Sequence, residues 1–155
     1  MKHVLLTVMA LAVCLMAGAQ SVDKLYKEGK KLYDAKQYTE AFQKLKPAAE
    51  KGHKKAQYRL ARCYAKGHGV AENDVVAVQW YTKSADQGYA KAQYRLAKCY
   101  MKGNGVAASE AKARELLSKA VKNGDKGKEI LVELRKDAGK GDADAIALLK
   151  LIGKK

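Results

Sequence analysis

The sequence has only one long apolar run, and it lacks low-complexity segments and interdomain linkers. After residue 19, no segment is apolar enough to cross a membrane. The absence of a linker excludes an evident division into separate units, and 155 residues fit one domain. We therefore expect a single domain over residues 20–155.

The apolar run lies at the N-terminus and has the pattern of a secretory signal peptide. After a basic start, Val4–Met16 is almost uninterrupted, and Ala17-Gly18-Ala19 supplies the small residues that a signal peptidase accepts. The run is too short to span a bilayer. We expect residues 1–19 to be removed and the protein to be exported to the periplasm or cell envelope. The alternative is a lipoprotein anchored at Cys14, although Val13 is a poor residue before an acylated cysteine.

The sequence also lacks the residue patterns that enzymes and metal sites need. It has no Ser/His/Asp order, no phosphate-binding loop and no plausible pair of catalytic carboxylates. Two histidines and two cysteines after the signal segment, His53, His68, Cys63 and Cys99, show no paired metal-ligand spacing. We therefore expect no catalysis, no metal and no cofactor.

Acidic residues are scarce relative to basic ones. The chain has 16 aspartates and glutamates against 31 lysines and arginines, which gives a formal net charge of +15. Lysine dominates and is spread along the chain, and such a balance favours anionic partners. An exported protein rarely meets nucleic acid. We therefore expect a protein partner with an acidic segment, and a membrane could be touched without insertion.

One block of the sequence occurs twice, at residues 56–70 and 92–106. The offset is 36 residues without insertion, and both copies begin with Ala-Gln-Tyr-Arg-Leu-Ala and end with Gly-x-Gly-Val. A fixed period in this range indicates stacked copies of one supersecondary unit. We expect two full repeats, at residues 53–88 and 89–124.

Apolar residues within each repeat recur at three- and four-residue steps, which is typical of helices. Two kinds of position return after 36 residues and predict how these helices begin and cross. Asn73 and Ser109 are predicted N-caps of the second helices. Ala41, Ala77 and Ala113 are small residues, and helices that cross at a short distance need small residues at the crossing point.

The two ends of the chain are less regular. Residues 22–52 form two helical stripes, and Pro47 would bend or tighten the second because it lacks an amide hydrogen. Residues 125–155 predict one helix from Lys128 to Ala138 and a last apolar helix after the glycines at 139–141. Terminal repeats are atypical because one face meets water, so we expect degenerate capping helices here.

Cysteine is scarce as well, and only Cys63 and Cys99 follow the signal segment. They occupy equivalent positions of successive repeats, and the axes of helices in contact lie about 8–10 Å apart. A disulfide needs Cα atoms within about 7 Å. We expect two buried or half-buried thiols, with an intermolecular disulfide as the alternative.

The block from Ala56 to Ala85 resembles the Sel-one-like repeat, a 36-residue relative of the tetratricopeptide repeat. The matching residues are Ala-Gln-Tyr-x-Leu-Ala-x-x-Tyr, Gly-x-Gly-Val and Ala-x-x-Trp-Tyr-x-Lys-x-Ala. The second copy has Leu116-Leu117 in place of Trp-Tyr, and residues 22–52 look like an ordinary tetratricopeptide unit. The resemblance implies an α/α superhelical solenoid of helix pairs that acts as an adaptor or scaffold for protein partners, without chemistry of its own.

The first helix of each repeat carries a stripe of tyrosine and basic residues. Tyr58, Arg62 and Lys66 are spaced by four, and Tyr58 stands about 200° around the helix from Ala56, away from the face that packs the core. The resemblance implies that first helices line a concave groove. The predicted partner-binding groove consists of Tyr26, Lys30, Lys55, Tyr58, Arg62, Lys66, Lys91, Tyr94, Lys98 and Lys102. The alternative is that the lysines solvate a helix surface and the tyrosines pack between repeats.

Together these patterns predict an exported, non-catalytic interaction adaptor or scaffold that docks an acidic segment in a basic, tyrosine-lined groove. The alternative function is an electrostatic binder of anionic envelope polymer or of a membrane surface.

Overall fold

The computed structural model describes residues 21–153, except for the side chain of Asp125. Within this range every regular element is a helix, which confirms the predicted all-α class. A helix over residues 21–34 is followed by α2 (Tyr38–Glu50), α3 (Lys54–Lys66), α4 (Asp74–Asp86), α5 (Ala90–Lys102), α6 (Glu110–Val121), α7 (Gly124–Gly139) and α8 (Ala143–Gly153). The predicted signal peptide lies outside the described residues.

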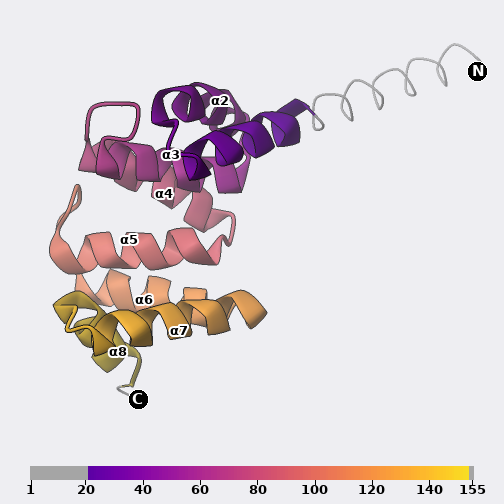
Figure 1. The fold of residues 1–155 in the computed structure, drawn as a ribbon. Coiled ribbons are helices and arrows are strands. Elements are labelled where there is room, and N and C mark those ends of the chain that lie inside the picture. Colours follow the sequence, from indigo (N-terminus) through magenta and orange to yellow (C-terminus); the bar gives the residue numbers. More distant parts are fainter. Residues whose placement is uncertain (1–20, 154–155) are drawn as a thin grey trace, which may run out of the picture.

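The helices stack in chain order and form an elongated solenoid (Figure 1). From α2 to α8, each helix packs against the one that follows it, so contacts run along the whole stack. Both α7 and α8 also reach back to α5 and α6, which closes the C-terminal end. None of the helices within residues 21–153 is long and apolar enough to cross a bilayer.

The repeated polar residues begin the second helices of the repeats as predicted. The Asn73 side chain accepts a hydrogen bond from the amide of Val76, and that of Ser109 accepts one from the amide of Lys112. These bonds satisfy amide groups that the helix itself leaves without partners. Ala41, Ala77 and Ala113, which recur at intervals of 36 residues, are all at most 1% exposed.

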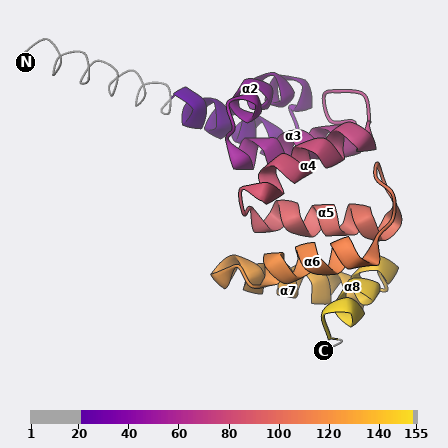
Figure 2. The same ribbon diagram turned by 180° about the vertical axis from the view of Figure 1, so that it is seen from behind.

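The two Gly-x-Gly-Val loops lie at the same edge of the stack, on the left in Figure 1 and on the right in Figure 2. Each loop packs on the start of the second helix of the preceding unit. A Cβ atom added to Gly69 would lie 2.3 Å from the carbonyl oxygen of Tyr38, and one added to Gly105 would lie 2.3 Å from that of Asp74. Both glycines also have positive φ, +72° and +67°. The loops can therefore approach the preceding helix only because these positions lack a side chain.

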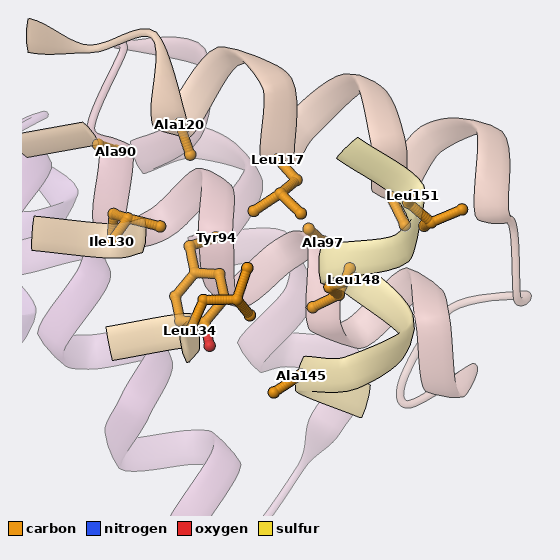
Figure 3. Close-up of a cluster of buried hydrophobic side chains, with 11 residues drawn as sticks. Ala90, Tyr94, Ala97, Leu117, Ala120, Ile130, Leu134, Ala145, Leu148 and Leu151 are labelled. Carbon is orange, nitrogen blue, oxygen red and sulfur yellow. The ribbon is translucent and has the colours of Figure 1, made fainter. Parts of the chain in front are cut away.

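The C-terminal helices share one apolar cluster with the second repeat. In Figure 3, Leu117 of α6, Ile130 and Leu134 of α7 and Leu148 of α8 converge around Tyr94 of α5. All four aliphatic side chains are fully buried. The α7–α8 pair is therefore an integral part of the stack.

The structure corrects one predicted boundary, because α7 begins at Gly124, four residues before Lys128. The chain enters α7 directly after α6, and a Cβ atom on Gly127 would lie 2.0 Å from the carbonyl oxygen of Val121. The missing side chain at this position allows the close approach of the two helices. Sequence periodicity registers no apolar residue here, so it places the start of the helix too late.

Buried glutamines tie each repeat to the helix before it. The side-chain amide of Gln57 donates a hydrogen bond to the Ala49 carbonyl at 3.2 Å, and that of Gln93 donates one to the Ala85 carbonyl at 3.2 Å. The Gln57 side-chain oxygen in turn accepts a hydrogen bond from Gln87 at 2.7 Å. In this repeat, both polar atoms of the buried glutamine have partners.

The next repeat lacks the second of these bonds, because Asn123 replaces the residue equivalent to Gln87 and is one methylene shorter. Asn123 donates to the Gly88 carbonyl at 3.0 Å, and the side-chain oxygen of Gln93 stays buried without a hydrogen-bond partner. We expect Asn123→Gln to supply the missing donor and to raise the free energy of unfolding by about 1 kcal/mol. Urea denaturation measures this change, and Gln87→Asn should lower stability. An Asn123→Gln chain no more stable than the wild type would contradict the assignment.

Candidate docking groove between α3 and α5

A groove of about 260 Å³ lies between the C-terminal halves of α3 and α5. Residues of α3, α4, α5 and the loop after α5 line it: Arg62, Ala65, Lys66, Asp74, Tyr81, Arg95, Lys98, Cys99, Lys102 and Asn104. Five of these side chains are basic and only Asp74 is acidic. The groove is therefore a positively charged surface that favours an anionic ligand.

The three basic residues that α5 contributes already have carboxylate partners in α7, in α8 and in the loop between them. Arg95 binds Glu133 of α7 at 2.9 Å. Lys98 binds Asp142 at 3.3 Å, and Lys102 binds Asp144 at 2.6 Å. The chain thus neutralises this side of the groove with its own acidic residues.

The equivalent residues of α3 differ in their ion-pair partners. Arg59 is bound by Asp34 at 3.1 Å, so the position equivalent to Arg95 is neutralised. Arg62 and Lys66 have no carboxylate within 4 Å anywhere in residues 21–153 whose side chains are described, and the Arg62 guanidinium lies 5.2 Å from the Tyr33 ring centroid. These two cations are available to a ligand that enters the groove.

The structure contradicts the predicted exposure of Tyr58 and Tyr94. Tyr58 is 7% exposed and Tyr94 only 1%. The Tyr58 ring packs edge-on against the Tyr89 ring, with centroids 5.2 Å apart. Burial raises the pKa of the Tyr94 hydroxyl to about 12. A helix inside a stack is covered by the following repeat as well as by its own pair, so the face opposite Ala56 is also buried. Both tyrosines pack between repeats, which was the alternative interpretation.

The other predicted groove residues lie in several places. Arg62, Lys66, Lys98 and Lys102 line the groove together. Tyr26 instead stacks on His53, with ring centroids 4.4 Å apart, and Lys30 forms an ion pair with Asp34 at 2.6 Å. Lys55 and Lys91 lie in the first turns of α3 and α5, away from the groove lining.

Sequence reasoning missed Arg95, although a signal for it was present. Arg95, Lys98 and Lys102 follow the i, i+3, i+7 spacing that places residues on one helical face. Two other lining residues that the sequence did not predict, Asp74 and Tyr81, come from α4. Their place in the groove depends on how α4 packs against α3 and α5, which no local spacing shows.

The two cysteines, Cys63 and Cys99, are free, one buried and one half-buried, as predicted. Burial raises the pKa of both thiols to about 11, so both are protonated at neutral pH. Among the side chains described for residues 21–153, no three His, Cys, Asp or Glu residues are grouped to hold a metal ion. An intermolecular disulfide stays a prediction.

His68 connects the first glycine loop to the start of the stack. Its Nδ1 lies 3.0 Å from the Tyr33 hydroxyl, and its ring stacks on Tyr38 with centroids 3.8 Å apart. Partial burial, and then the positive charges of Arg62 and Lys66, lower the pKa of His68 below 6.5. The folded chain therefore favours the neutral ring.

This lowered pKa predicts a loss of stability in mild acid. The unfolded chain binds a proton at His68 more tightly than the folded chain does. The contribution of His68 to the free energy of unfolding is therefore fully present above pH 6.5 and is lost as the pH falls below that value. His68→Asn introduces the residue that the second repeat has at Asn104 and should remove this part of the pH dependence. The midpoints of urea unfolding of the wild type and of His68→Asn, at about pH 7.5 and about pH 5.5, measure this pH dependence. Both chains retain His53, so any effect of that histidine is common to them. Equal losses in the two chains would contradict the prediction.

The fold and the groove define a class of protein, an α/α repeat solenoid of the kind that binds other proteins. Three segments of the chain, residues 8–53, 54–89 and 90–125, match the Sel1 repeat family. The chain therefore belongs to the Sel1 repeat family, whose repeats typically mediate protein–protein binding.

Relatives and solved structures support the same assignment. Over 59 residues the chain is 42% identical to an exopolysaccharide production negative regulator of Rhizobium meliloti (strain 1021), a match covering 38% of this chain and 22% of that protein. A Sel1 repeat protein from Oxalobacter formigenes aligns with a TM-score of 0.64 and 28% identity over 83% of this chain and 55% of that chain. A protective antigen of uropathogenic Escherichia coli strains, which has an SLR fold, aligns with a TM-score of 0.68 and 26% identity. This alignment covers 88% of this chain and 31% of that chain. The chain thus spans between 22% and 55% of the lengths of these proteins. The two solved structures support the predicted solenoid.

Proposed function

We propose that this Sel1 repeat chain is a non-catalytic adaptor that docks an acidic protein segment in the α3–α5 groove. The observation that carries the proposal is the difference between two equivalent pairs of cations. Lys98 and Lys102 of α5 are bound by carboxylates of the chain itself, whereas Arg62 and Lys66 of α3 have no carboxylate within 4 Å among the described side chains. Carboxylates bind such groups through charge-assisted hydrogen bonds, which are stronger than neutral ones.

The groove favours a protein segment over a purely electrostatic contact with a polymer or membrane. Its free cations lie at one place between two helices, beside the partly buried Lys98, and α4 contributes Tyr81 to the lining. A localised site of this kind selects for ligand shape as well as charge. Net charge spread along the chain would attract polyanions without any dependence on Arg62 or Lys66.

We further propose that the adaptor works in the periplasm or cell envelope, after export and removal of residues 1–19. The basic start, the apolar run and the small residues before position 20 support this location. Alkaline phosphatase fused to residues 1–24 should be active in the periplasm. The same enzyme fused to residues 20–24, which lack the apolar run, should not be active there. Equal activity of the two fusions would contradict export by this segment.

A pull-down from envelope extract tests the docking site. The wild-type chain is compared with Arg62→Glu/Lys66→Glu and with a control, Lys51→Glu/Lys54→Glu. The control carries the same charge change on exposed lysines outside the groove lining. We expect the wild type and the control to retain the same discrete protein and the groove variant to lose it. Retention of the same polyanionic material by all three chains would refute the adaptor function and identify the net charge as the binding determinant.

A further inference from the structure

We propose that the segment docked by Arg62 and Lys66 begins a helix with two aspartates two residues apart, an Asp-x-Asp start. This inference rests on the proposed function and adds the local chemistry of the partner. It comes from a contact that the chain makes with itself one repeat further along, where Asp142 and Asp144 bind Lys98 and Lys102.

The contact on α5 matches two carboxylates to two cations one turn apart. Lys98 and Lys102 are separated by four residues, so their Cα atoms differ by about 6 Å along the helix axis. Asp142 lies 3.3 Å from Lys98 and Asp144 lies 2.6 Å from Lys102. The side chain of Lys98 is only 17% exposed, so its contact with Asp142 is shielded from much of the solvent.

The start of a helix presents these carboxylates in a fixed arrangement. One oxygen of Asp142 accepts a hydrogen bond from the Ala145 amide at 2.9 Å, and the other accepts one from Lys98. The amide of Ala145 and then Lys98 hold the pKa of Asp142 below its usual range. Asp144 lies in the first turn of α8, where the helix dipole favours a negative charge. The Ala145 amide therefore orients the Asp142 carboxylate through a contact that does not involve Lys98.

Arg62 and Lys66 repeat the receiving half of this contact. They precede Lys98 and Lys102 by 36 residues, share their four-residue spacing, and line an open groove of about 260 Å³. The third cation of the α5 set, Arg95, uses Glu133, but its equivalent Arg59 is already bound by Asp34. A ligand therefore needs two carboxylates and no third.

Two labelled peptides of equal composition and charge test the motif by fluorescence anisotropy with the full chain. One is an alanine-rich helix of about 18 residues that begins with Asp-x-Asp, and the other has the same two aspartates in the middle of the helix. We expect the first to bind at least about tenfold more tightly to the wild type and to the Lys51→Glu/Lys54→Glu control. This preference should be lost in Arg62→Glu/Lys66→Glu.

Equal binding of the two peptides, or a preference that persists in Arg62→Glu/Lys66→Glu, would overturn the Asp-x-Asp motif. The proposed function fails separately, when retention of the extract protein does not depend on Arg62 and Lys66. A partner that depends on these residues while the peptides show no preference would leave the adaptor standing and remove only the motif.

Discussion

Replacing Gly105 with alanine should lower the free energy of unfolding by about 2–4 kcal/mol. The new Cβ would lie 2.3 Å from the carbonyl oxygen of Asp74, which belongs to the backbone and cannot rotate away. Gly105 also has a φ of +67°, in the left-handed region that costs an alanine about 1 kcal/mol or more. Small domains are stable by only about 5–15 kcal/mol, so this loss is a large share of the total.

Gly88→Ala is the matched control for this change. Gly88 has a similar φ of +73°, but a Cβ atom there would meet nothing within 4 Å. Gly88→Ala should therefore lower the free energy of unfolding by only about 1 kcal/mol, the strain of an alanine at positive φ. Urea denaturation of both variants separates the two contributions. If Gly105→Ala proves no more destabilising than Gly88→Ala, the loop does not make the inferred close contact with α4.

Leu148→Ala should lower the free energy of unfolding by about 3 kcal/mol, within the range for fully buried leucines. Leu148 of α8 is 0% exposed and lies in the C-terminal cluster with Leu117, Ile130 and Leu134. Removing its side chain leaves a cavity among residues of three helices (Figure 3). The prediction follows from α8 being the helix that closes the stack.

Ile146→Ala on the same helix is the control, because Ile146 is 37% exposed. Its loss should be about 1 kcal/mol, since much of the side chain meets water already. Thermal unfolding of the two variants compares the two faces of α8. Similar small losses for both would show that α8 is only loosely attached, which would contradict its place in the core.

The architecture could be predicted because its signals are local and occur twice. The repeated block fixes the period, Asn73 and Ser109 mark helix starts, and the glycine loops mark helix ends. Each of these features acts on its own few residues, so a sequence without a structure is enough to identify it. Residues after Gly124 lack the repeated block, and there the sequence pattern predicts the start of α7 four residues too late.

The candidate site could be predicted only in part, because it depends on contacts between distant residues. Spacing placed Arg62 and Lys98 on basic stripes, but it also placed Tyr58 and Tyr94 outside the core. A helical wheel shows which residues share a face and does not show which neighbour covers it. The ion pair of Lys98 with Asp142 joins residues 44 positions apart, and no local pattern predicts it.

The central claim is that the α3–α5 groove docks a partner, and site-specific photo-crosslinking tests it most directly. A photoreactive residue replaces Ala65, which lines the groove without belonging to the proposed pair of cations, and in a second chain it replaces Lys54, on the same helix but outside the groove lining. Both chains are irradiated in envelope extract. We expect one discrete crosslinked protein from position 65, none from position 54, and loss of the product when Arg62→Glu is added. A product that forms equally from both positions, or that survives Arg62→Glu unchanged, would contradict docking in this groove.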